Sequence, residues 1–333
     1  MRRFEKILDI VLPIIIGIEL IILVIGNNSL DSIFFSLKEI LLIPFNWFII
    51  FLSMLIGYIG EALRGIRWKL LIKPMNFKVK TIDLVNACAA GYMFNAGVPR
   101  SGEIARCSLI NRVAKTPISY LFGHVLVERV IDFIILFFCI IVCLVYKWNI
   151  IISLISNSNY FSWILTTNTL IVVLLILGLI LFSFSLKEEF LKFKSLEWIK
   201  KYLFKIKEGV YAIFSVKEKK LFAIYTILIW LCYLLMTYVC FWCFQSMQSF
   251  SLLDGLLIMT IGGIGMMIPT PGGMGSYHGA VYIGLFFVLG QEASVATTFG
   301  FLVHTAQTIM IIVMGFIGLI FLNLRKPYNS RLR

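Results

Sequence analysis

The feature that most constrains this chain is a series of long, nearly uninterrupted apolar runs. Hydrophobic residues make up 60% of its 333 residues and charged residues only 14%, with a mean hydropathy of +0.95. The main runs cover residues 7–25, 45–59, 133–146, 170–184, 221–244 and 303–322. Runs of this kind predict membrane-spanning helices, because hydrocarbon offers unpaired backbone groups no water. The absence of residue-by-residue alternation argues against an outer-membrane barrel.

Basic side chains predict how these helices are oriented. Nearly all of the lysines and arginines fall in five groups, at 2–6, 64–80, 100–115, 187–220 and 325–333. Cytoplasmic loops of membrane proteins carry an excess of Lys and Arg. We therefore expect these groups, and with them both termini, on the cytoplasmic side of the cytoplasmic membrane. No small-residue cleavage site follows the first run, so we expect it to remain as an uncleaved span.

Two apolar segments are interrupted by helix-breaking residues. Segment 83–117 is broken at Asn95-Ala-Gly-Val-Pro99, and segment 254–290 is broken between Pro269 and Gly275. Each arm of about 15 residues gives ~23 Å of helix, which is less than the ~30 Å of a hydrocarbon core. Re-entrant hairpins and pairs of short spans both remain open. Broken segments in both halves of a membrane chain indicate a transport site.

Taken together, these patterns predict an all-α polytopic membrane protein that forms a single domain over residues 1–333. We expect about six full transmembrane helices and two interrupted or re-entrant helical segments. Residues 187–220 place apolar side chains on one helical face and lysines on another, which predicts an amphipathic helix on the inner leaflet. The net charge of +13 therefore suits anionic lipid headgroups better than nucleic acid.

The first break carries charged residues that point to a binding site. Arg100, Glu103 and Arg106 are spaced i, i+3, i+6, so they share one helical face. Pro99 and Gly102 interrupt the helix and free backbone groups, and Ser101 is expected to cap the next helix. The alternative interpretation is a cytoplasmic loop with solvated charges.

A second group of ionisable residues lies inside the apolar stretch 118–146. Glu128 and Asp132 share one helical face with His124, and Arg129 reaches Asp132 at i+3. Ionisable residues at membrane depth are costly and indicate function by default. The alternative is an internally neutralised structural network with residues of the second span: Glu61, Arg64 or Arg67. We expect no metal here and no cofactor.

The third pattern is the glycine-rich break Pro269-Thr-Pro-Gly-Gly-Met-Gly-Ser-Tyr-His278. Gly272, Gly273 and Gly275 allow close backbone approach or expose N–H groups to an anion. Tight helix packing at a turn explains the same residues equally well. His278 fits either a packed interior position or a proton-sensitive one.

With these residues the chain resembles the lysylphosphatidylglycerol synthase transmembrane family, whose members are also called flippase-like domain proteins. The resemblance rests on three groups of residues: Asn95, Pro99, Arg100, Gly102, Glu103 and Arg106; Glu128, Arg129 and Asp132; and Pro269 to Gly275. It implies movement of a phospholipid between leaflets. The family's larger members add an aminoacyl-transferase domain, which does not follow here, so we expect no lysyl-lipid synthesis. The family often has Glu where this chain has His278.

We therefore expect a lipid flippase or lipid-transport protein whose partners are membrane lipids, an anionic phospholipid or a lipid-linked substrate. Alternatives are a membrane enzyme acting on a lipid-linked substrate and a non-transporting partner of a membrane synthase. No catalytic residue is assigned. The expected headgroup site comprises Asn95, Arg100, Glu103, Arg106, Glu128, Arg129, Asp132 and His278. The expected turn residues are Pro99, Gly102, Pro269, Pro271, Gly272, Gly273 and Gly275.

Overall fold

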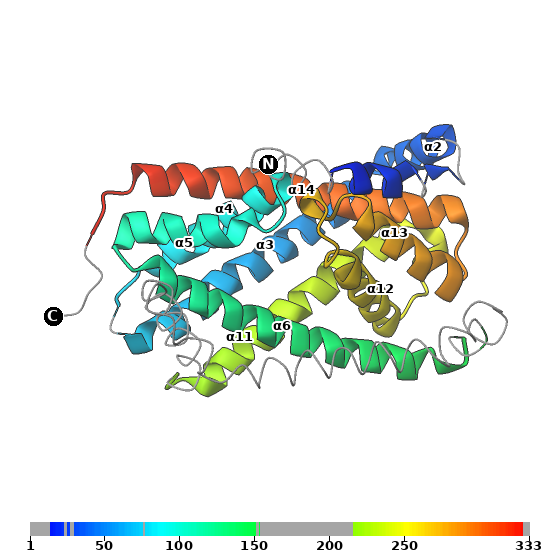
Figure 1. Cartoon of the computed structure of the whole chain (residues 1–333). Coiled ribbons are helices and arrows are strands. Elements are labelled where there is room, and N and C mark those ends of the chain that lie inside the picture. Colours follow the sequence, from blue (N-terminus) through cyan, green and yellow to red (C-terminus); the bar gives the residue numbers. More distant parts are fainter. Residues whose placement is uncertain are drawn as a thin grey trace, which may run out of the picture.

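A computed structural model of the chain describes residues 14–22, 25–26, 30–75, 77–150, 153 and 216–328. Within these residues the protein is a bundle of helices joined by short connections (Figure 1). The α-helices discussed below are α2 (Leu30–Leu42), α3 (Pro44–Ile72), α4 (Thr81–Gly97), α5 (Ser101–Ala114), α6 (Ile118–Tyr146), α11 (Lys219–Tyr238), α12 (Leu252–Gly265), α13 (Ser276–Ile283) and α14 (Ala293–Leu324).

Four of the described helices are long and apolar enough to span a membrane. They are α3, α6, α14, and α11 together with the 3-10 turn that extends it to Cys243. The α6 face bearing Phe133, Phe137 and Phe138 is exposed, as expected for side chains that meet lipid. This confirms a polytopic α-helical membrane protein. Of the expected first span, residues 14–22 are helical, whereas the expected span 170–184 and nearly all of segment 187–220 lie outside the described residues.

Helix α3 extends well beyond the apolar run that predicted it. The run ends at residue 59, but the helix continues to Ile72 and carries Glu61, Arg64 and Arg67 in its buried part. The expected cytoplasmic group 64–80 is therefore wrong for Arg64 and Arg67, which lie within the helix and are neutralised there, as the alternative of a network with the second span predicted. The two arginines stay in the helix because α6 supplies carboxylates that neutralise them.

Helices α4 and α5 form a hairpin around the first break. Both ends of the hairpin meet the C-terminal segment, since the Tyr328 hydroxyl binds Asp83 at the start of α4 and its N–H binds the Val113 carbonyl near the end of α5. Burial raises the pKa of Tyr328 to about 12, so this phenol stays protonated and donates to Asp83. The two arms touch where Gly91 faces Gly102, with no room for a Cβ on Gly102.

Helices α12 and α13 form a second hairpin around the glycine-rich break. A capping box between Ser251 and Asp254 starts α12, and Asp254 forms an ion pair with Lys147 at the end of α6. After α13 the chain returns to the end of the bundle where α12 begins. The hydrogen bond that Gln291 accepts from Ser246 shows this, since the two residues lie on either side of the hairpin. The break itself contains three glycines with positive φ, Gly272, Gly273 and Gly275, a conformation that side chains resist.

The two hairpins enter the bundle from opposite ends and meet inside it. In Figure 1, α4 and α5 lie on the side of the C-terminus, and α12 and α13 lie towards the other side. Their turns meet where Ala96 contacts Gly272. A Cβ atom added to Gly272 would lie 3.2 Å from the Ala96 Cα atom. Both broken segments are therefore hairpins, and neither crosses the bundle from end to end as two short spans would.

We call the end of the bundle that holds the start of α4 and the end of α14 the basic end. Its exposed cations include Lys69, Lys73, Lys78, Lys80, Lys115 and Lys326. A hydrophobic core centred on Trp68, Leu84 and Ile110 surrounds the first hairpin. A separate core around Phe241, Ile258 and Phe299 supports the second hairpin. Each hairpin is thus held by its own packing.

Candidate functional site

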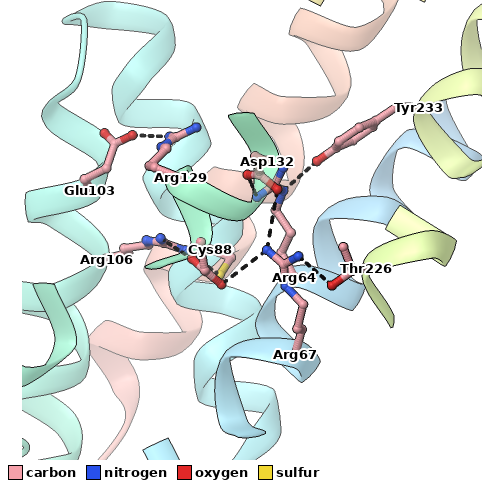
Figure 2. Close-up of polar contacts among 10 residues, drawn as sticks. Arg64, Arg67, Cys88, Glu103, Arg106, Arg129, Asp132, Thr226 and Tyr233 are labelled. Carbon is pink, nitrogen blue, oxygen red and sulfur yellow. Dashed lines mark hydrogen bonds and ion pairs between the residues drawn. The ribbon is translucent and has the colours of Figure 1, made fainter. Parts of the chain in front are cut away.

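Charged side chains gather where α3, α5 and α6 approach one another beside the first hairpin. Figure 2 shows that they come from separate helices and point toward one another. The ion-paired members of this cluster, which we call the arginine cluster, are Arg64, Arg67, Glu103, Arg106, Glu128, Arg129 and Asp132.

Glu128 is the acidic centre of the cluster. Its side chain is 1% exposed, and it accepts a hydrogen bond of 2.5 Å from Nη2 of Arg106. Nη2 of Arg67 lies 3.8 Å from its other oxygen. The Arg106 guanidinium also lies over the Trp68 ring, 4.7 Å from its centroid. The pairing explains how two arginines are accommodated at membrane depth, because an unpaired buried charge is strongly unfavourable.

Asp132 lies one helical turn further along α6 and binds the arginines of α3. Its carboxylate is 2.6 Å from Nη1 of Arg64 and 3.7 Å from Nη2 of Arg67. Arg64 also donates from Nε to the Tyr233 hydroxyl at 2.6 Å, and Arg67 donates to the Thr226 hydroxyl at 3.0 Å. These contacts orient both guanidinium groups from the side of α11 (Figure 2).

Arg129 and Glu103 form the most accessible ion pair of the cluster. The pair joins α6 to α5. The Arg129 side chain is 53% exposed, whereas the Glu103 side chain is 15% exposed. An ion pair exposed to this degree contributes little stability.

A cavity lies within the cluster and against the first hairpin. It is lined by Arg64, Cys88, Gly91, Tyr92, Asn95, Gly102, Glu103, Arg106, Glu128 and Arg129. The lining therefore brings together five of the eight residues expected for a headgroup site: Asn95, Glu103, Arg106, Glu128 and Arg129. Asp132 joins the same cluster through Arg64.

The residues of the first break shape this cavity through the backbone. The Asn95 side-chain oxygen accepts a hydrogen bond of 2.7 Å from the Gly102 N–H, which closes the turn. The expectation that Ser101 caps α5 is wrong. The Ser101 hydroxyl donates instead to the carbonyls of Val98 and Phe94 and so completes the end of α4. Arg100 occupies the N-cap position without a side-chain cap.

Two expected site residues lie elsewhere. Arg100 is exposed at the hairpin turn, outside the cavity lining, with a left-handed φ of 61°. His278 is buried in α13, where its Nδ1 accepts from the Gly275 N–H at 3.2 Å. Its ring lies 4.6 Å from that of His304, which binds the Gly272 carbonyl. His278 thus belongs to the packing of the second hairpin.

Several residues of the site were not expected from the sequence. Tyr92, Cys88, Trp68, Tyr233 and Thr226 are apolar or weakly polar positions within helices, and nothing in the local sequence distinguishes them. Arg64 and Arg67 did carry a signal, because two arginines spaced i, i+3 next to an apolar run need acidic partners. The described residues contain no group of three or more His, Cys, Asp or Glu side chains able to hold a metal.

Comparison with known proteins identifies the family. Residues 10–315 match the sequence model described as the lysylphosphatidylglycerol synthase TM region. The chain belongs to this family. The match includes both hairpins and every residue of the arginine cluster, which places the site within a lysylphosphatidylglycerol synthase TM region and makes this a multi-pass membrane protein of a lipid-related family. No curated protein and no solved structure matches the chain.

Proposed function

We propose that this chain moves a lipid with an anionic headgroup between the leaflets of the cytoplasmic membrane. The observation that carries the proposal is the position of the arginine-lined cavity. Asn95 lines that cavity, and its neighbour Ala96 contacts the turn of the second hairpin. Two broken helical segments that meet from opposite ends beside a polar cavity match the architecture of alternating-access transport sites.

The chemistry of the lining favours a phosphate. Arginine guanidinium groups bind phosphate oxygens through two parallel hydrogen bonds, and the lining presents Arg64, Arg106 and Arg129. Their carboxylate partners neutralise them when the cavity is empty. A phosphate that replaces the Glu103 carboxylate at Arg129 keeps this arginine paired with an anion, and the charge that loses its partner is that of Glu103.

The surroundings of Arg129 favour a lipid over a soluble phosphate. Ile104, Val130 and Phe133 lie near Arg129 along α5 and α6, and they are 61%, 59% and 58% exposed. The exposed end of the cavity therefore lies among apolar side chains suited to hydrocarbon. A headgroup can enter there while its acyl chains stay in the bilayer.

The test is translocation by the purified protein in liposomes. A fluorescent phosphatidylglycerol in the inner leaflet is followed by chemical quenching of the outer leaflet. We expect Arg129→Gln to slow translocation at least ~10-fold, which corresponds to loss of about one charge-assisted hydrogen bond. Lys78→Gln, which removes an exposed cation at the basic end, should remain within about twofold of the unmodified protein.

Other outcomes would replace this proposal. A covalently altered lipid would make the protein a membrane enzyme. Neither translocation nor alteration, in a protein that still folds and retains the arginine cluster, would favour a non-transporting partner of a lipid synthase. Equal translocation rates for Arg129→Gln and Lys78→Gln would mean that translocation does not depend on Arg129 of the arginine cluster.

A further inference from the structure

Among the described residues, one buried acidic residue near the cavity forms no ion pair. Glu61 lies on α3 and is 5% exposed. Its Oε2 atom has no hydrogen-bond partner, and Glu61 forms no ion pair with any described residue. It lies one helical turn before Arg64 and interacts electrostatically with Arg64 and with Tyr92, both of which line the cavity. An ionised carboxylate in this position is costly, so a proton on Oε2 relieves the cost.

The charge balance of the arginine cluster gives this proton a role. Among the described residues, the cluster pairs four arginines with only three carboxylates, those of Glu103, Glu128 and Asp132. One positive charge is left over. When the cavity is empty, this surplus positive charge favours the ionised form of Glu61 and offsets part of the cost of burying it. A phosphodiester headgroup carries one negative charge and balances it when the cavity is filled, and Glu61 is then surplus.

We propose that Glu61 takes up one proton when an anionic lipid headgroup binds and releases it when the headgroup leaves. In this step a hydronium ion of the medium gives its proton to the Glu61 carboxylate: one O–H bond of hydronium breaks, one O–H bond forms on Glu61, and water is left. Lipid and proton then occupy the site together at unchanged net charge, so a transmembrane proton gradient drives the lipid. This inference rests on the proposed function and adds the charge of the substrate and the source of energy.

The surroundings of Glu61 distinguish it from the carboxylates of the arginine cluster. Glu61 interacts electrostatically with Tyr58 and Arg64 on its own helix and with Tyr92 on α4. From α11, Tyr233 packs against the adjoining Gly60 and binds Arg64, while from α6 Asp132 holds the other side of Arg64. Each of the three cluster carboxylates has an arginine within ion-pair distance, which favours the ionised form.

The experiment measures binding of short-chain phosphatidylglycerol to the purified full-length protein between pH 5.5 and 8.5. If binding takes up one proton, the affinity falls by up to ~10-fold for each unit by which the pH is raised. This slope holds over the pH range in which Glu61 of the lipid-free protein is ionised. We expect this slope in the unmodified protein. In Glu61→Gln, which carries a permanently neutral side chain of the same shape, we expect tight binding with no slope. Glu39→Gln, an exposed change on α2, should keep the full slope.

Two further measurements make the result decisive. Glu61→Asp retains a titrating group, so a slope should persist there even if Glu61→Gln fails to fold. In weakly buffered solution, binding should also remove about one proton per lipid from the medium, as linkage requires.

Each contrary outcome identifies what has failed. Phosphatidylglycerol binding with no pH slope in the unmodified protein overturns proton coupling and leaves the proposed function in place. An equal slope in Glu61→Gln overturns the assignment to Glu61. No binding by the unmodified protein at any pH overturns the anionic-lipid site itself, and with it both proposals.

Discussion

Glu128 is the residue on which the buried charges of this protein most depend. It accepts a hydrogen bond from Arg106, lies within ion-pair distance of Arg67, and is almost fully buried. The exposed pair between Lys73 and Glu218 at the basic end has the same chemistry, but its side chains are 65% and 41% exposed. Burial decides how much stability is lost when one partner of a pair is removed. The remaining charge stays desolvated in the buried pair, whereas water solvates it in the exposed pair.

We predict that Glu128→Gln lowers the free energy of unfolding by about 3–5 kcal/mol, since it leaves buried arginine without a counter-charge. Glu218→Gln should lower it by less than about 1 kcal/mol. Thermal unfolding of both variants in the same detergent tests this. Similar melting temperatures would mean that water reaches the cluster and solvates its charges.

Arg100 combines an unfavourable backbone with an exposed position. A non-glycine residue with left-handed φ costs about 1 kcal/mol, and such strain is common at functional sites. We predict that Arg100→Gly leaves thermal stability unchanged or raised. Because Arg100 lies outside the cavity lining, the variant should retain as much phospholipid through purification as the unmodified protein. A stably folded Arg100→Gly protein that loses its bound phospholipid would place Arg100 on the path of the headgroup.

At the scale of elements, the two hairpins depend on close backbone approach. The first hairpin needs glycine where Gly91 faces Gly102, because a Cβ on Gly102 would overlap the Gly91 carbonyl oxygen. Its turn is then closed by the hydrogen bond from the Gly102 N–H to Asn95. The shape of the cavity follows from this contact, since both glycines line it.

We predict that Gly102→Ala lowers the free energy of unfolding by about 2 kcal/mol, because two backbones must move apart to admit the methyl group. Gly97→Ala offers a matched control in the same hairpin, since a Cβ there meets nothing within 4 Å. It should be neutral or slightly stabilising. Chemical or thermal unfolding compares the two variants, and equal effects would argue against tight contact between the arms.

At the scale of the whole molecule, the structure has two chemically different ends. The basic end carries most of the exposed lysines of the described residues. At the opposite end, Lys147 is paired with Asp254. From the positive-inside rule we predict that the basic end faces the cytoplasm, with the first hairpin entering from the cytoplasm and the second from the outside.

Cysteine labelling in intact cells tests this orientation. Lys78, Lys326 and Gln248 are exposed, and most of the native cysteines described by the structure are buried. We predict that a membrane-impermeant thiol reagent labels Gln248→Cys from outside and labels Lys78→Cys and Lys326→Cys only after the cells are opened. External labelling at position 78 or 326 would show that the basic end faces the outside of the cell, contrary to this prediction.

Much of the fold could be predicted because it depends on local features. Apolar runs predict helices wherever water is absent, and proline and glycine mark the breaks at Pro99 and Pro269–Gly275. Spacing along α6 correctly predicted that Glu128 and Asp132 share a face. Hydropathy alone ends the second span before Arg64 and Arg67, and only the alternative of a neutralised network included them; their partners on α6 keep them inside the helix.

The sequence by itself determined that this chain is a helical membrane protein with two broken segments and charges at membrane depth. Only the tertiary structure decided that the breaks are opposed hairpins, that Ala96 contacts Gly272, and which carboxylate binds which arginine. It also decided that Glu61 forms no ion pair with any residue that the structure describes. The physical reason is separation along the chain: propensity and hydropathy act over a few residues, but the partner of Arg64 in this site lies 68 residues away.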